Sequence, residues 1–352
     1  MKWLMPVIYT LLLLGGWLWV AYLYIDYTLE SPVRDEVVTL EIPPDSSVQK
    51  IGELLEEKNL IRNSIFFRIY AKYTDNTNLI AGVYEVNKDD DLIAILKKIA
   101  SGKQDDVKIT IPEGFNVYEI ADVLEKRGFN KEAFLKEVDR SEAKTEIEKR
   151  IKDNEDRSFK LEGYLYPTTY NFRKDATPEL IVNTMLAEFQ KNWDKLDGDN
   201  LIKAGNLELD EAVIYASLVE KETMINEERP KIARVIYNRL KRPESFALNI
   251  DAATVYGIRM EENRVVKRLL DKDYAFSSPY NLYKQNPEYP ESGLPPGPIA
   301  NPRIQSLEAV LKPAKNYNAY FYQTKIENPA EHIFFETLAE HEAYRKKKAA
   351  LQ

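Results

Sequence analysis

The most hydrophobic part of the chain lies near its start, where residues 3–25 contain no charged side chain. At about 1.5 Å of rise per helical residue, this segment is long enough to cross a bilayer core of about 30 Å. Its tryptophans and tyrosines are typical of a membrane interface. Residues 21–24 lack the small side chains of a signal-peptide cleavage site. We therefore predict an uncleaved anchor helix at residues 1–25 and a tether at residues 26–36.

The charges that flank this segment predict its orientation. Lys2 and the terminal amine precede it, whereas Asp26 and Glu30 follow it. Positive charge favours the cytoplasmic side of a membrane. We expect a single-pass protein of the cytoplasmic membrane, with its amino terminus inside and the rest of the chain outside.

Beyond the tether, short alternating runs and amphipathic runs follow one another. We predict strands at residues 37–42 and 82–86, and helices at residues 48–55, 65–73 and 91–100. Together they would form a small α/β module, residues 37–104.

A strand–turn–helix pattern occurs twice without a gap. Ile42-Pro43 and Ile111-Pro112 begin the two copies. Apolar residues then recur at matching spacings, and Asn59 and Gly128 occupy the position where each helix should end. The pattern predicts two equivalent units, by duplication or by common function, although strands and helices often alternate in this way.

The remainder, residues 105–345, predicts a mixed α+β domain, with residues 346–352 as a tail. The expected elements are helices at 178–196, 210–223, 232–240 and 306–311, a strand at 317–324 paired with one around Phe334, and a last helix carrying His341. Charge-rich residues 141–156 read as a solvated segment. The proline-rich residues 277–302 predict a stiff connection that either lines a groove or wraps the surface.

One carboxylate interrupts the apolar stripe of the helix at residues 210–223. Glu220 follows Ser217 and Ala216 on the same helical face, where small side chains would leave open space. A carboxyl group walled by aliphatic side chains has a raised pKa, as a general acid near neutral pH requires. The alternative is a Glu at the helix edge that pairs with Lys221 or Arg229 in solvent.

Composition narrows the chemistry to carboxylates. The net charge of -8 argues against a nucleic-acid binder. The chain has no cysteine and only two histidines, His332 and His341. It therefore has no residue for thiolate chemistry and few for a metal centre or a Ser-His-Asp triad. We expect no metal and no cofactor.

Several separated motifs occur along the chain at residues 161–167, 216–223, 233–240, 278–281 and 293–299, followed by His332, Phe334 and the pair Glu340-His341. In these motifs and their order, the chain resembles the YceG-like endolytic murein transglycosylases from the anchor to about Tyr344. The chain departs from the family pattern at Thr168, where an Asp is usual, and after Asp251, where Ala252 and Ala253 replace part of an Asp-Pro-Thr run.

The resemblance implies cleavage of the MurNAc-GlcNAc β-1,4 bond in nascent peptidoglycan strands, outside the cytoplasmic membrane. It also implies that residues 37–104 form a LysM-like, glycan-binding module and that residues 105–345 are catalytic. The partners would be glycan strands, the membrane and peptidoglycan synthases.

In this interpretation Glu220 protonates the glycosidic oxygen and then takes the proton of the muramoyl 6-hydroxyl, which closes a 1,6-anhydro ring. The expected substrate-binding residues are Glu162, Ser217, Tyr280, Asn281 and Tyr283.

Two other functions remain open from the sequence. A hydrolase would use Glu162 or Asp251 as a second carboxylate. A membrane-anchored scaffold of the cell-wall machinery would bind glycan through the LysM-like part and cut nothing. Product analysis separates the three: anhydro ends, reducing ends, or no turnover.

Overall fold

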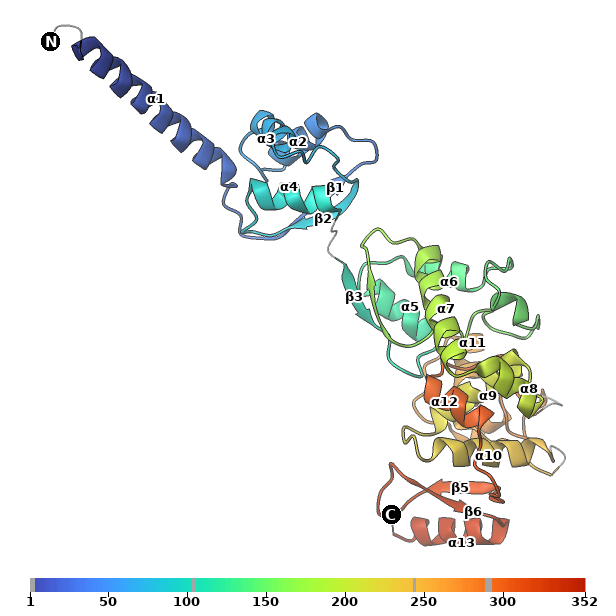
Figure 1. Ribbon diagram of the computed structural model, residues 1–352. Coiled ribbons are helices and arrows are strands. Elements are labelled where there is room, and N and C mark those ends of the chain that lie inside the picture. Colours follow the sequence, from blue (N-terminus) through green and yellow to red (C-terminus); the bar gives the residue numbers. More distant parts are fainter. Residues whose placement is uncertain (1–3, 103–105, 243–244, 289–292, 352) are drawn as a thin grey trace. The chain divides into compact units, whose positions relative to one another are not determined.

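The computed structural model describes residues 4–102, 106–242, 245–288 and 293–351 and has a mixed α+β fold (Figure 1). The chain divides into two compact units. Unit 1 comprises residues 1–107 with 171–176, and unit 2 comprises residues 108–170 with 177–352. The predicted module boundary at residue 104 lies outside the described residues.

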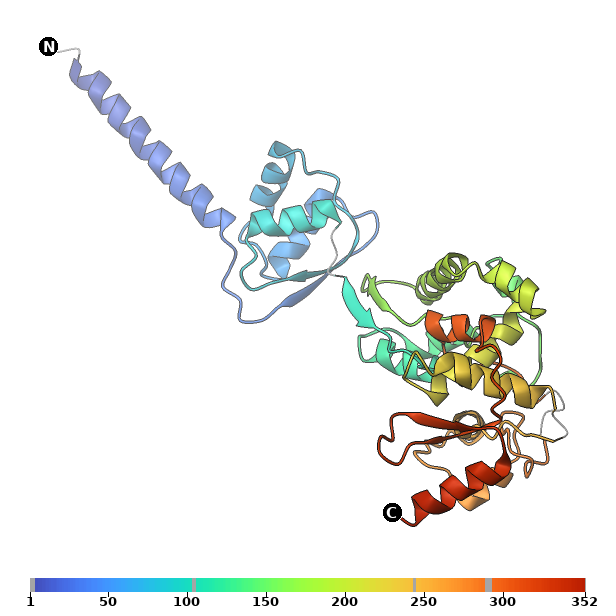
Figure 2. The same cartoon turned by 60° about the horizontal axis from the view of Figure 1, so that its bottom comes forward.

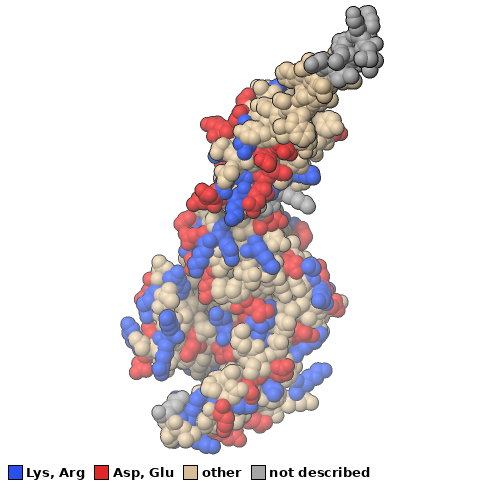
Figure 3. Space-filling model, turned by 90° about the vertical axis from the view of Figure 1, so that its left-hand side faces the viewer, with Lys and Arg blue, Asp and Glu red and all other residues tan. Residues whose placement is uncertain are grey.

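Helix α1 (Leu4–Leu29) begins unit 1 and continues past Ile25, so the predicted tether starts later than expected. Within the described part of the chain, one helix is long and apolar enough to cross a membrane, at Thr10–Leu29. Its surface is nearly free of charged side chains, whereas the surface beyond it mixes both signs (Figure 3). The helix is compatible with a single-pass membrane anchor.

The rest of unit 1 has the order strand–helix–helix–strand–helix. Its elements are β1 (Val38–Ile42), α2 (Val48–Glu57), α3 (Ser64–Tyr73), β2 (Gly82–Val86) and α4 (Leu92–Ser101). The two strands pair antiparallel, with Val38 opposite Val86. Side-chain oxygens of Ser47, Asn63 and Asp91 cap the three helices. These elements agree with the predicted boundaries, and the LysM-like assignment stays a prediction.

The internal repeat has the same local geometry in both copies. Helix α2 ends at Glu57 and α5 (Val117–Glu125) ends at Glu125. Asn59 and Gly128 then adopt φ values of 57° and 89°, in the left-handed region that ends helices. The amide of the next residue bonds the equivalent carbonyl in each copy, Leu60 to Leu55 and Phe129 to Leu124. The predicted helix ends are confirmed.

Unit 2 begins with a strand pair and a group of helices. Its first elements are β3 (Val107–Thr110), paired with β4 (Thr169–Phe172), then α5, α6 (Lys131–Val138), a 3-10 turn (Glu148–Arg150), α7 (Pro178–Lys195) and α8 (Gly198–Gly205). Helix α7 packs against α6 and α8, and Thr177 caps its first turn.

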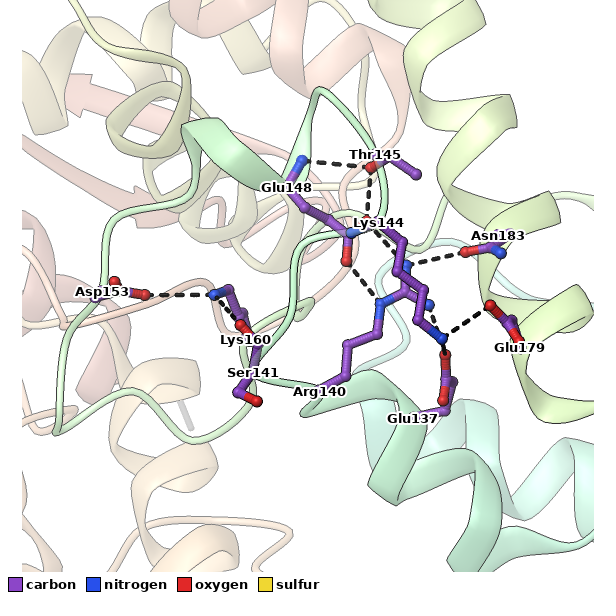
Figure 4. Close-up of polar contacts among 10 residues, drawn as sticks. All are labelled: Glu137, Arg140, Ser141, Lys144, Thr145, Glu148, Asp153, Lys160, Glu179 and Asn183. Carbon is purple, nitrogen blue, oxygen red and sulfur yellow. Dashed lines mark hydrogen bonds and ion pairs between the residues drawn. The ribbon is translucent and has the colours of Figure 1, made fainter.

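The charged segment 141–156 is mostly exposed, as predicted, but one of its charged residues is tied to the domain. Glu148 is buried, and both of its carboxylate oxygens accept bonds from Arg140 at 2.8 Å (Figure 4). Arg140 also reaches Glu137 and Asn183, on α6 and α7. This buried ion pair therefore joins two helices to the loop, while most of the segment faces water.

The remaining helices surround α9 (Leu209–Glu222). They are α10 (Arg229–Leu240), α11 (Asp251–Glu262) and α12 (Ile304–Leu311), with a 3-10 turn at Asp271–Ala275. The chain then forms the hairpin β5 (Phe321–Thr324) and β6 (His332–Phe335), and α13 (Leu338–Ala349) packs along this hairpin (Figure 2). The predicted strand at 317–324 begins at Phe321.

Candidate functional site

Glu220 lies inside a cluster of positive and polar groups. Its carboxylate accepts bonds from the backbone amide of Arg303 at 3.1 Å, the Arg303 Nε at 2.9 Å and the Ser306 hydroxyl at 2.7 Å. A second guanidinium, that of Arg229, lies 3.8 Å away. The predicted aliphatic walls are therefore not found around this carboxylate. Glu220 is only 4% exposed and ties α9 to α12.

Ser217 provides no open space beside Glu220. It is fully buried; its hydroxyl donates to the Ile214 carbonyl at 2.6 Å and accepts from the Ile299 amide at 3.1 Å. The prediction of a gap at this position is wrong, because the proline-rich connection fills it. Ser217 instead fastens that connection to α9.

Glu162 is also internal. Its carboxylate accepts bonds from the Val117 amide, the Tyr256 hydroxyl and the Asn301 side chain at 2.9–3.2 Å. Burial raises its pKa to about 8, although these hydrogen bonds act in the opposite direction. The residue joins the start of α5 to α11 and to the proline-rich connection.

Tyr280 and Asn281 are buried as well, so neither presents its polar group to a ligand. The Tyr280 hydroxyl accepts from the Ser158 amide, and the ring lies 4.9 Å from that of Tyr256. Asn281 is hydrogen-bonded to Thr254 and to backbone groups of the loop before it. Both residues shape the loop instead of lining an open surface.

Tyr283 is the predicted binding residue that does reach an accessible place. It is partly exposed, and its hydroxyl donates to Asp251. Its ring contacts that of Tyr274 edge-on at 4.7 Å. Asp251 is exposed at the start of α11, so this pair brings a carboxylate and an aromatic ring to the surface together.

The structure identifies a further carboxylate, Glu222, that the sequence interpretation left without a role. It is the last residue of α9 and is partly exposed. The Tyr322 hydroxyl, from β5, donates to its Oε2 at 2.5 Å. Burial raises the pKa of Glu222, and the negative charge of Asp251 adds to this rise. The Tyr322 hydrogen bond and the nearby His332 act in the opposite direction.

His332 has a fixed position beside this carboxylate. Its Nδ1 lies 2.8 Å from Glu228 Oε2, and its backbone amide donates to Glu228 Oε1 at 2.7 Å. The Thr223 hydroxyl donates to the Glu228 carboxylate at 3.0 Å. The ring of His332 meets that of Tyr322 edge-on at 5.6 Å. The end of α9 and the hairpin β5–β6 are thus held together around Glu222.

A cleft of about 540 Å³ opens beside this group. Asp251 and Lys221, the neighbour of Glu222 in the sequence, line it. Tyr118 on α5, Arg259 on α11 and Lys267 also line it. A partly exposed carboxyl group with a raised pKa next to an open cleft is a suitable general acid.

The chain is similar to characterised bacterial proteins. It is 34% identical over 305 residues to an endolytic murein transglycosylase of Streptococcus pneumoniae, covering 81% of this chain and 54% of the relative. The chain thus spans about half the length of that relative. It is 32% identical over 348 residues to the endolytic murein transglycosylase of Bacillus subtilis, covering 96% of this chain and 91% of the relative.

A solved structure has the same fold. The crystal structure of a yceG-like protein from Listeria monocytogenes matches with a TM-score of 0.59 and 32% sequence identity, over 88% of this chain and 99% of that one. The sequence model of the YceG-like family matches residues 40–347. Because this match covers most of the chain and agrees with the relatives, the protein belongs to the YceG-like family.

Proposed function

We propose that the protein is an endolytic peptidoglycan lytic transglycosylase. It would cut the MurNAc-GlcNAc β-1,4 bond within nascent strands and leave 1,6-anhydro-MurNAc ends. The names of the pneumococcal and Bacillus relatives support this activity. The observation that carries the proposal is the setting of Glu222: burial raises its pKa, and Asp251, whose charge acts on it, lines a cleft together with Lys221.

Glu222 would act twice in the reaction. As an acid it protonates the glycosidic oxygen, the bond from this oxygen to muramoyl C1 breaks, and the GlcNAc end leaves as an alcohol. The muramoyl 6-hydroxyl oxygen then bonds to C1, and its proton returns to Glu222. No water enters and the carboxyl group is regenerated, so one such group is enough.

Glu222 takes the place of Glu220 in the proposal. The Glu220 carboxylate is occupied by Arg303 and Ser306 and is almost inaccessible. A glycosidic oxygen cannot approach it unless these contacts break. Glu220 would then be structural, as would Ser217, Glu162, Tyr280 and Asn281, and Tyr283 would remain a candidate sugar contact.

Two isosteric variants, Glu222→Gln and Glu220→Gln, test this assignment. We expect Glu222→Gln to lower turnover of purified glycan strands by a factor of about 10²–10⁴, the usual contribution of general acid–base catalysis. Its circular dichroism and melting temperature should stay near those of the parent. Glu220→Gln should lower stability and retain turnover. Anhydro-muropeptides, detected by mass spectrometry, are the readout, and full activity of Glu222→Gln would exclude the proposed role.

A second candidate function is muramidase activity, and Asp251 is the observation in its favour. Its charge acts on Glu222, and it is exposed next to the same cleft. A second carboxylate in such a position can activate water. Reducing MurNAc ends that disappear in Asp251→Asn would support hydrolysis, whereas anhydro ends that persist in this variant support the lytic reaction.

We also propose that α1 anchors the protein in the cytoplasmic membrane with its amino terminus inside and unit 2 outside. The chain has no cysteine, so one introduced thiol reports its own location. In intact spheroplasts, a membrane-impermeant maleimide should label Asp153→Cys, at a highly exposed side chain, and should not label Lys2→Cys. The opposite pattern would reverse the orientation. Glycan binding by residues 37–104 and contact with synthases belong to the same proposal.

A further inference from the structure

The cleft beside Glu222 has a group of positive side chains that the proposed reaction does not use. Lys221, Arg259 and Lys267 line it from α9, α11 and the segment after α11. Lys221 donates to the Gly114 carbonyl at 3.2 Å, and Arg259 donates to the Asn263 carbonyl at 3.1 Å. Within the described residues, none of the three forms an ion pair with an Asp or Glu, so their charges are available to a ligand.

The acidic residues of the same cleft already have partners. Asp122 pairs with Lys131, Glu119 accepts from the Asn116 amide in a capping box, and Asp251 accepts from Tyr283. A fourth cation, Arg264, is bound by Glu262 and Asp273. Glu119 and Asp251 keep their negative charge, because their hydrogen-bond partners are neutral. Among the described residues that line the cleft, three cations and these two carboxylates form no ion pair, so unpaired positive charges outnumber negative ones, although the chain as a whole is negative.

The walls between these cations are suited to an organic ligand rather than a small inorganic anion. Val255, Val265 and Val266 supply apolar surface, and the Arg259 guanidinium lies over the Tyr118 ring at 5.4 Å from its centre. The cleft volume of about 540 Å³ is large enough to hold several residues of a peptide. The geometry fits an extended group with carboxylates and short aliphatic side chains.

We propose that this cleft binds the acidic stem peptide attached to the muramoyl residue next to the cleaved bond. This inference rests on the proposed function and specifies its substrate as a peptide-bearing strand. The stem peptide is linked through the lactyl group at O3 of the ring whose C1 reacts. The cleft lies correspondingly close to the acid, since Lys221 precedes Glu222 and Asp251 acts on it electrostatically.

Binding of the peptide in this cleft would make the enzyme cleave strands with charged stem peptides faster than strands whose peptide carboxylates have been neutralised. Lys221, Arg259 and Lys267 would pair with its carboxylates, and the valines would contact its alanine methyl groups. Each pair at such an accessible place is weak, and two or three together give a preference of about tenfold.

The test compares one batch of glycan strands in two forms, with stem-peptide carboxylates free or converted to primary amides. For the parent protein we expect kcat/KM to fall about tenfold on amidation. The double variant Arg259→Glu/Lys267→Glu should cleave both forms at similar rates. Lys346→Glu, on α13 and outside the cleft, is the matched charge control and should keep the preference. Equal kcat/KM for both forms with the parent protein, or a preference that persists in the double variant, overturns the inference.

A binding measurement separates this inference from the proposed activity. The free, soluble stem pentapeptide is titrated into the full-length Glu222→Gln protein in detergent by calorimetry. We expect saturable binding that is lost when Arg259→Glu/Lys267→Glu is added and kept with Lys346→Glu. Peptide binding without any turnover by the parent protein would refute the transglycosylase and leave the peptide site standing. Turnover with no peptide binding and no substrate preference would support the transglycosylase activity and refute the peptide site.

Discussion

Two carboxylates of one helix differ in every respect that matters for proton transfer. Glu220 and Glu222 are two positions apart, which turns their side chains about 200° from each other around α9. Glu220 contacts Arg303 and Ser306 in the interior, and Glu222 contacts Tyr322 of the hairpin. The helix thus provides a structural ion cluster and a proposed acid from nearly opposite faces of one turn.

Tyr322→Phe tests how the proposed acid is adjusted. The Tyr322 hydroxyl donates to the Glu222 carboxylate, which favours its charged form and lowers its pKa. The variant loses this hydrogen bond, so the pKa of Glu222 should rise further. Because the first step needs the protonated acid, activity falls as pH rises through this pKa. We expect the falling limb of the kcat profile to move about one to two pH units higher.

A purely structural role for Tyr322 would give a different result. The variant would then lose activity equally at all pH values, with the limb unmoved. A shift of the limb to lower pH would contradict the proposed identity of the acid. The conservative change Tyr317→Phe, on a ring that contacts Phe334 rather than Glu222, controls for hairpin packing.

The sequence interpretation chose Glu220 of this helix as the acid and gave Glu222 no role. Helical periodicity fixes which positions share a face, but not what faces them. Arg303 and Ser306 lie more than eighty residues after Glu220, and Tyr322 lies 100 residues after Glu222. The side chains that decide between the two carboxylates come from segments that fold against α9 only in the tertiary structure.

At the scale of elements, the local sequence pattern was sufficient to predict most helix and strand boundaries. The strands, caps and helix ends of unit 1 and the duplicated turn at Asn59 and Gly128 depend on neighbours within a few residues. The charged segment 141–156 is mostly exposed as predicted, but the burial of Glu148 was not foreseen, because Arg140 and α7 lie outside the segment. The proline-rich connection was ambiguous for a similar reason: Ser217 and Glu162 anchor it from other elements.

The contact between α9 and α12 depends on a buried ion pair, and Arg303→Met tests it. The variant leaves the Glu220 carboxylate buried with fewer partners. Breaking one member of such a pair costs about 3–5 kcal/mol of unfolding free energy. Urea denaturation should show this loss for Arg303→Met, in which the Arg229 guanidinium, 3.8 Å away, is the cation still facing Glu220. A loss below about 1 kcal/mol in the single variant would mean that water reaches Glu220.

At the scale of the whole molecule, unit 1 has a hydrophobic core of its own. The core comprises residues from Leu40 to Ile99 on both strands and all three helices after α1. Phe67 is fully buried in it. A core made from one continuous stretch of chain can unfold without disrupting the helices around α9.

We therefore expect two calorimetric transitions for the full-length protein in detergent, and Phe67→Ala to lower only one. Truncation of a buried Phe costs about 3–5 kcal/mol. The second transition, from unit 2, should stay within error, and so should turnover of short soluble glycans. A single transition, or two that move together, would show that the units unfold cooperatively.

The hydrogen bond between Tyr322 and Glu222 has a consequence for biosynthesis. A ribosome adds Glu222 first and must extend the chain by 100 further residues before Tyr322 exists. An unfinished polypeptide that is already threaded across the membrane would therefore carry an acid that lacks its partner. For most of that interval the fragment would also lack Arg303 and Ser306, which fasten α9 to α12, so the acid should reach its working position only as synthesis nears that late hairpin.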